Sequence, residues 1–271
     1  MLTALGAKGE DVYTERQVVE FEARYPEIMA RLDRLHASCV TNAHVLPHDS
    51  RAREYLLFGA GRRISVLRRA MSRIFEIFPL RLERPLPLAE IHDVQIYLQA
   101  YVMNLFGLFD NLAWAFVLFH DLENQVGGKF GVGFQRLGTQ RFLPQPLRNY
   151  VTNEQYRQWN ENYLKSYRDA LAHRIPLYIP PAQFTAEEGE RFNELEDEKF
   201  RCIREYDFER LEQVEGEQRS LGKPMPAFLH SFEEDGARGP VLLHPQLLSD
   251  AMAVAEFGEL FFNNWQQASR G

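Results

Sequence analysis

The chain has 271 residues, 45% of them hydrophobic and 13% aromatic, and a formal net charge of −7. This composition is typical of a soluble globular protein that buries a sizeable core as one large domain or two small ones. The two cysteines, Cys39 and Cys202, lie far apart and outside any Cys-x-x-Cys pattern, so neither a disulfide framework nor a zinc site is indicated. Residues 1–10 lack the charged-then-apolar profile of a signal peptide, and we expect a cytoplasmic protein.

In the first half of the chain, apolar residues recur at the spacing of an α-helix. Pro26 either interrupts the first helix or starts a second one. A proline-rich connector, 84–87, precedes a long apolar run. The predicted helices run from Thr14 to Arg24, from Pro26 to about Ala37, from Asp49 or Ser50 to Phe78, and through the apolar run to about Glu123.

The apolar run from Val94 to Phe119 is long enough to raise the alternative of a membrane span. An aspartate at mid-bilayer would cost roughly 2.5–3.5 kcal/mol on insertion scales. At about 100° per residue, four polar side chains fall within roughly 60° of one another and form one stripe on an apolar rod. These are His92, Gln95, Gln99 and Asp110. The pattern favours the central helix of a bundle, with no membrane contact.

The second half is predicted to be helical around one extended excursion. Thr152-Asn153-Glu154-Gln155 has the form of a capping box and opens a helix that ends before Pro176. Four further segments follow: extended chain over 175–181, a charged helix from Ala186 to Gln218, a ribbon pairing 224–232 with 240–243, and a helix from Pro245 to Gln267. We therefore expect an all-α helical bundle with a small extended or β-ribbon excursion, in a single domain over residues 1–271.

The hexapeptide Arg168-Asp169-Ala170-Leu171-Ala172-His173 places an arginine and a histidine five positions apart at a predicted helix end. An arginine offers a rigid fork of donors to phosphate oxygens, and an imidazole can give or take a proton near neutral pH. The pair suits phosphodiester chemistry. The same spacing from Arg31 to His36 has leucine after the arginine, and we interpret it as chance.

On this motif the chain resembles the HEPN domains, a superfamily of small α-helical bundles. Their motif is an arginine, commonly followed by a small polar or acidic residue, then a histidine after four to six intervening positions. Arg168, Asp169 and His173 match it position by position. The resemblance implies a HEPN-like core over approximately 50–175 with a C-terminal helix at 245–268, and leaves 176–244 as an excursion.

The resemblance also implies a reaction, the metal-independent cleavage of RNA by attack of the 2′-hydroxyl on the neighbouring phosphate. His173 would serve as base or acid, Arg168 would stabilise the charge on the phosphoryl oxygens, and Asp169 would orient one of them. In similar proteins two motif helices meet across a dimer, and some members bind nucleotides or scaffold partners. The expectation is a homodimer that binds RNA or a nucleotide without metal or cofactor, beside an antitoxin or a nucleotidyltransferase partner.

A non-catalytic helical interaction module is the alternative. Arg168 lies about 40° beyond Leu164 on the helical wheel, at the border of the buried face. Its head is expected to meet Asp110 on the polar stripe. His173 would then cap the helix C-terminus, where a cation is favoured by about 0.3–1 kcal/mol. In this alternative the motif is structural.

Two further patterns concern anion binding. Seven arginines crowd residues 51–73, but we expect a solvated helix face there, and the net charge opposes attraction to a polyanion. The glycine-rich loop 127–133 has no Ser or Thr after Lys129, so we expect a helix connector rather than a phosphate cradle. Lys129, Arg136 and Arg141 leave a minor anion-binding alternative.

Overall fold

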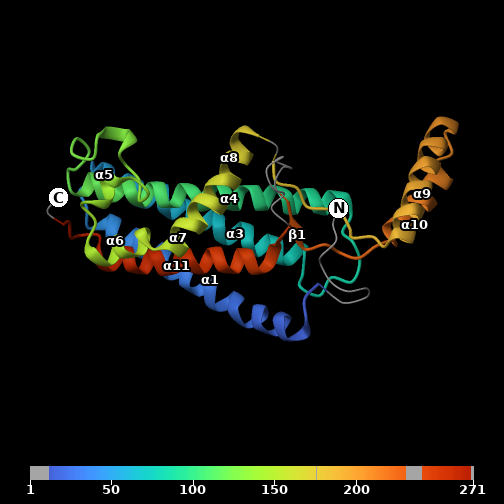
Figure 1. The fold of residues 1–271 in the computed structure, drawn as a ribbon, viewed down its shortest axis with the longest axis horizontal. Helices are drawn as coiled ribbons and strands as arrows, with labels where there is room; N and C mark the ends of the chain where they lie inside the picture. The colour runs from blue at the N-terminus through green and yellow to red at the C-terminus, as the bar shows by residue number, and fades with distance from the viewer. Residues whose placement is uncertain (1–11, 175, 230–239, 270–271) are drawn as a thin grey trace.

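The computed structural model describes residues 12–174, 176–229 and 240–269. Four long helices form a bundle, and a helical hairpin projects from one end of it (Figure 1). The bundle helices are α1 (Glu15–His44), α3 (Arg62–Ile77), α4 (Leu88–Phe119) and α11 (Leu243–Asn264). Short helices α6 (Gln145–Thr152), α7 (Glu154–Gln158) and α8 (Ser166–His173) lead across α11 towards α4. The expected all-α bundle is confirmed.

Helix α1 is continuous through Pro26, so the predicted break there is wrong. Thr14 and Gln17 form a capping box at its start. Phe21 and Ile28, on either side of the proline, are both buried, and the helix packs along α11. Burial along this whole face stabilises the helix by more than the local cost of the proline.

The predicted helix from residue 50 to 78 is confirmed, with a π-helical segment that was not expected. Helix α2 (Arg51–Glu54) continues into η1 (Tyr55–Gly61) and then α3. Gly59 lies against α4, where an added Cβ would approach the Asn111 Cγ to 2.8 Å. The backbone therefore needs glycine at this crossing.

Helix α4 is the centre of the bundle and packs on α3, η1 and α8. It is the one helix of the described residues that is long and apolar enough to cross a membrane, and 56% of that apolar window is buried within the protein. The core helix of a soluble protein has the same composition. The helix ends at Phe119, four residues before the predicted end.

The charged segment after residue 185 is two antiparallel helices, not one. Helix α9 (Ala186–Glu205) ends at Tyr206 in a left-handed conformation, and α10 (Phe208–Arg219) returns beside it. The predicted ribbon is confirmed in its described part: β1 (Ala227–Phe228) pairs antiparallel with β2 (Val241–Leu242). Residues 230–232 of that prediction lie outside the described residues. The remaining short elements are η2 (Gly128–Phe130), α5 (Leu137–Gln140) and η3 (Trp159–Lys165).

Candidate functional site

The helix that carries the hexapeptide is built from α7, η3 and α8. The Asn153 side chain accepts from the Gln155 amide and caps α7. Thr152 instead ends α6 and donates to the Arg148 carbonyl, so the predicted capping box is wrong. At the other end the helix ends at His173, as predicted, and Arg174 after it is extended.

A buried carboxylate on α11 fixes the π-helical segment of this helix. Asp250 has no exposed surface, and it accepts hydrogen bonds from Trp159 Nε1 and Tyr163 Oη, each at 2.8 Å. Gln246 Nε2 donates to the same group at 2.7 Å. Burial raises the Asp250 pKa to about 7, although the three donors lower it. The motif helix is thus held in position by a group that no sequence pattern indicated.

Arg168 has a border position, as predicted, but its partner differs from the predicted one. Its side chain is 26% exposed, and Nη1 lies 3.0 Å from Asp169 Oδ1 on its own helix. Its Cζ lies 4.1 Å from the centre of the Phe106 ring of α4, a cation–π contact. No ion pair joins Arg168 to Asp110, so the expected direct pair is not formed. Arg168 pairs instead with Asp169, the next residue in the sequence.

Arg168 and Asp110 nevertheless line the same hollow, which has a volume of about 550 Å³. It lies between α4, the segment 132–136 and the η3–α8 helix. This size is within the range of small-molecule sites in proteins. Charged side chains line it on several sides: Arg136, Lys165, Arg168, Asp110 and Glu161. Three phenylalanines and a tyrosine supply aromatic surface: Phe106, Phe109, Phe134 and Tyr156.

The hollow also collects polar atoms that lack a partner. Among the described residues, four buried side-chain atoms make no hydrogen bond, and three of them belong to its lining: Gln135 Nε2, Tyr156 Oη and Arg168 Nε. Burial raises the pKa of the Tyr156 phenol, and the nearby Gln135 side chain opposes this effect, but the two atoms lack hydrogen-bond geometry. Buried polar atoms in proteins are nearly always bonded, to protein, water or ligand. Three such atoms gather at this hollow, which makes it the candidate site.

Asp110 lies in the mouth of the hollow. Its side chain is reached by solvent, yet the surrounding walls desolvate the carboxylate and raise its pKa. Arg168, Arg63 and Arg136 oppose this effect and lower the pKa. The three cations therefore act on the Asp110 carboxylate without forming an ion pair to it, and two of them, Arg136 and Arg168, line the hollow.

His173 is not part of the hollow. It is the exposed last residue of α8, and it makes no hydrogen bond to the described residues. Because α8 stays α-helical to its end, His173 is about 140° from Arg168 around the axis. Asp169 lies between two cations, 3.0 Å from Arg168 and 3.5 Å from Lys165 Nζ. One chain does not bring Arg168 and His173 to one point.

The arginines of residues 51–73 are largely used within the fold. Arg63 Nε donates to Asn111 at 2.8 Å, and Arg68 pairs with Asp33 at 2.7 Å. Arg53 donates to backbone carbonyls at the end of α1. Arg31, which has the same spacing to His36 as Arg168 has to His173, is also used within the fold, because it pairs with Glu259 through two nitrogens.

Most of the residues that line the hollow have no signal in the sequence. Gln135, Tyr156 and Lys165 carry no pattern that distinguishes them from ordinary helix or loop residues. The sequence indicates Arg136 only as part of a minor anion-binding alternative, and the structure places it in the lining beside Gly133. Arg141 instead donates to the Gln125 carbonyl and stabilises the loop. The glycine-rich loop 127–133 is a connector, and the segment 132–136, which overlaps its end, forms one wall of the hollow.

Within the described ranges, no three His, Cys, Asp or Glu side chains gather as a metal-binding group. Comparison with protein-family models, with curated proteins and with solved structures finds no match to this chain. The hollow and the hexapeptide are therefore interpreted from their own chemistry.

Proposed function

We propose that the hollow beside Arg168 binds the phosphate-bearing end of a nucleotide, free or within RNA, and that the chain is a HEPN-like nucleotide- or RNA-binding protein. The observation that carries this proposal is the gathering of unpartnered buried polar atoms in the same hollow as Arg168. An unpaired buried donor or acceptor costs roughly 1–3 kcal/mol, and a polar ligand would recover that energy.

The lining supplies a group for each part of a nucleotide. Arg136, Lys165 and Arg168 are cations that can contact phosphate oxygens, and an arginine fork does so through two donors. Asp110 and Glu161 accept from ribose hydroxyls or exocyclic amines. Of the four aromatic side chains of the lining, Phe106 is partly exposed, beside the Arg168 guanidinium, and a base would stack there. Such stacking is worth about 1–3 kcal/mol per base.

The charge distribution is compatible with an anionic ligand. Residues 186–219 contain 13 acidic and 6 basic side chains, a net −7, which equals the net charge of the whole chain. The rest of the protein therefore has no net charge. Helices α9 and α10 lie away from the motif helix (Figure 1). The acidic character of the chain is thus remote from the hollow.

The test is a calorimetric titration with AMP, ATP and a short single-stranded RNA. We expect saturable binding to the wild type and at least about tenfold weaker binding to Arg168→Ala, since a charged hydrogen bond is worth about 1.5–3 kcal/mol. Arg62→Ala is the matched control, because Arg62 also stacks on a phenylalanine, at 4.7 Å from the Phe58 ring, but outside the hollow. Equal binding by wild type and Arg168→Ala, or no binding of any of the three probes, would contradict the proposal.

RNA cleavage is a second candidate, favoured by the exposed and unbonded His173 at the end of α8. It requires a second copy of the chain to supply His173 opposite Arg168. We expect His173→Ala to leave nucleotide binding and thermal stability unchanged, because the side chain packs on little, and to remove cleavage of single-stranded RNA measured in EDTA. General acid–base catalysis contributes about 10²–10⁴-fold. Equal cleavage by both proteins removes His173 from the mechanism, and absence of cleavage by wild type leaves the binding function alone.

A further inference from the structure

The chain that follows α4, residues 124–153, is here called the basic segment. It contains four basic side chains and no acidic one, in a chain whose net charge is −7. The four are Lys129, Arg136, Arg141 and Arg148. Figure 1 shows the basic segment at the end of the bundle opposite α9 and α10, which carry the acidic excess. An anionic ligand is therefore attracted to the end of the bundle where the basic segment lies.

The four cations of the basic segment form no ion pair with a described residue. Glu123, the last acid before the segment, pairs instead with Arg51 at 2.9 Å. Arg141 and Arg148 donate to backbone carbonyls within the segment, and such bonds do not neutralise their charge. The basic segment therefore keeps a positive charge that acts on other molecules.

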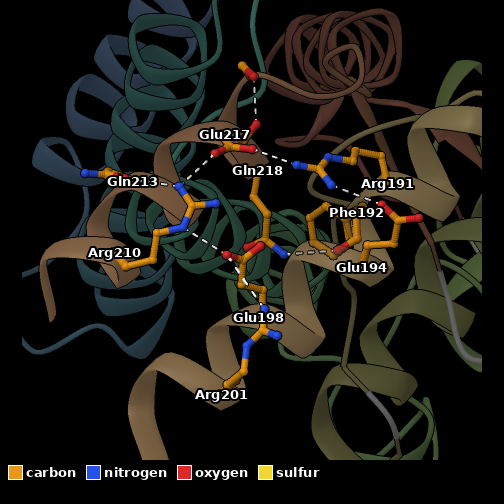
Figure 2. Close-up of polar contacts among 10 residues, drawn as sticks. Arg191, Phe192, Glu194, Glu198, Arg201, Arg210, Gln213, Glu217 and Gln218 are labelled. Carbon is orange, nitrogen blue, oxygen red and sulfur yellow. Dashed lines mark hydrogen bonds and ion pairs between the residues drawn. The ribbon is translucent and has the colours of Figure 1, made fainter. Parts of the chain in front are cut away.

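The arginines of α9 and α10 are used differently. Figure 2 shows Arg191 pairing with Glu217 and Arg210 pairing with Glu198, each at 2.9 Å, across the two helices. Arg191 also pairs with Glu194 at 3.0 Å. These ion pairs neutralise the arginines that lie between the two helices. Neutralisation of this kind is not found among the described cations of the basic segment.

The basic segment also holds the two most exposed large apolar side chains of the described residues. Phe130 is 80% exposed and Leu137 is 82% exposed. Each is followed by a glycine, Gly131 or Gly138, where an added Cβ would overlap the Val126 carbonyl. The two glycines lie together, since an added Cβ at Gly138 would be 3.4 Å from the Gly131 carbonyl oxygen. Phe130 and Leu137 therefore project from adjacent points of the backbone.

Thr139 holds this part of the chain in shape. Its side chain has no exposed surface, and its hydroxyl donates to the Gly131 carbonyl at 2.8 Å and accepts from the Gly133 amide at 3.2 Å. Gln140 Nε2 also donates to the Phe134 carbonyl at 2.8 Å. The loop is thus closed by its own hydrogen bonds while it keeps two apolar side chains in solvent. Exposed apolar groups with polar neighbours are typical of interaction sites.

Lys129, Phe130, Arg136 and Leu137, here called the loop patch, adjoin the hollow. Arg136 belongs to both surfaces because it lines the hollow, and Leu137 is the next residue, with its Cα about 3.8 Å away. Phe130 and Leu137 do not line the hollow themselves. The Lys129 ammonium lies 5.0 Å from the centre of the Phe130 ring. A ligand that extends out of the hollow past Arg136 therefore meets an exposed aromatic ring with a cation beside it.

We propose that the loop patch binds the nucleotides next to the one in the hollow, so that the ligand is a single strand of nucleic acid rather than a free nucleotide. This inference rests on the proposed function of the hollow. A base would stack on the Phe130 ring, and Lys129 and Arg136 would contact phosphates. The bases of a single strand are free to stack on a protein ring, whereas those of a duplex are stacked on one another. An anionic lipid surface is also attracted by cations, but it does not enter the hollow that Arg136 lines.

The test is calorimetric titration of the full chain with 5′-phosphorylated riboadenylates of one to about eight nucleotides, of which AMP is the shortest. We expect the affinity of the wild type to increase from AMP to the longer strands. Phe130→Ala should bind the longer strands about 5- to 150-fold more weakly, the range for one stacked base, and should bind AMP as the wild type does. Phe130→Trp, which keeps an aromatic face, should bind both as the wild type does.

Phe58→Ala is the matched control for Phe130→Ala. Phe58 is also exposed and has a cation over its ring, Arg62 at 4.7 Å, but it lies on η1. Lys129→Ala gives a separate readout of charge: it should reduce the slope of log affinity against log salt concentration by about 0.7 for the longer strands, the contribution of one phosphate contact. The substituted side chains are exposed, and circular dichroism checks that each variant is folded.

AMP separates this inference from the proposed function of the hollow. If AMP binds but longer strands bind no more tightly, or if Phe130→Ala binds the longer strands as Phe58→Ala does, the inference is wrong and the proposed function stands. If longer strands bind through Phe130 while AMP does not bind and Arg168→Ala has no effect, the loop patch stands and the proposed function is wrong. Binding of phosphatidylserine vesicles through Phe130, without binding of any riboadenylate, would overturn both, as would the absence of all binding.

Discussion

Replacing Tyr156 by phenylalanine should stabilise the ligand-free protein. The Tyr156 side chain is 7% exposed and its hydroxyl makes no hydrogen bond. A buried polar group without a partner costs roughly 1–3 kcal/mol. The nearby Gln135 side chain offsets part of this cost. We therefore expect the substitution to raise the free energy of unfolding by about 1 kcal/mol, at the lower end of that range. In a chain of this size the melting temperature should rise by about 2–4 °C.

Tyr101→Phe is the matched control, with the opposite sign. Tyr101 is fully buried, and its hydroxyl donates to the Leu247 carbonyl at 3.0 Å. Losing this bond should lower the free energy of unfolding by about 0.5–1.5 kcal/mol. Urea denaturation followed by circular dichroism, without nucleotide, measures both variants. If Tyr156→Phe destabilises the protein as much as Tyr101→Phe does, the Tyr156 hydroxyl has a partner in the free protein and the reasoning about the hollow is refuted.

Two other predictions concern stability alone. The Asp250 carboxyl has a pKa of about 7 when folded and near 3.9 when unfolded, so stability is lost as pH rises through this window, by on the order of 4 kcal/mol. Asp250→Asn should remove this slope in denaturation curves at pH 4 to 8, and parallel curves for variant and wild type would contradict the assignment. Gly258→Ala should destabilise by about 1–3 kcal/mol because the new methyl group overlaps the Leu35 side chain, whereas Gly216→Ala, with open space around it, should stabilise α10 by about 0.5–1 kcal/mol. Thermal melts of the two glycine variants check this, and a shift of equal sign in both would contradict it.

The bundle was predictable because its helices follow local rules. The apolar period of residues 94–119 identified the central helix, and the proline at residue 176 marked the end of the motif helix. The border position of Arg168 followed from the helical wheel and is confirmed by its partial exposure. These features depend on neighbours within one or two turns.

The hollow and the turn between α9 and α10 could not be predicted in this way. Segment 132–136 and helix α4 meet Arg168 through folding of distant parts of the chain, and no residue spacing encodes that contact. The sequence predicts one helix over α9 and α10 because the turn between them contains neither glycine nor proline, and Tyr206 takes the conformation that glycine usually marks. The π-helical segments, Tyr55–Gly61 and Trp159–Lys165, have no sequence signature either.

A crystal structure of the protein grown with AMP tests the central proposal most directly. We predict the phosphate within hydrogen-bond distance of the Arg168 guanidinium, with Arg136 or Lys165 beside it, and a ligand atom bonded to the Tyr156 hydroxyl or the Gln135 amide. A hollow filled only by ordered water that satisfies these atoms, or AMP bound elsewhere on the protein, would contradict the account.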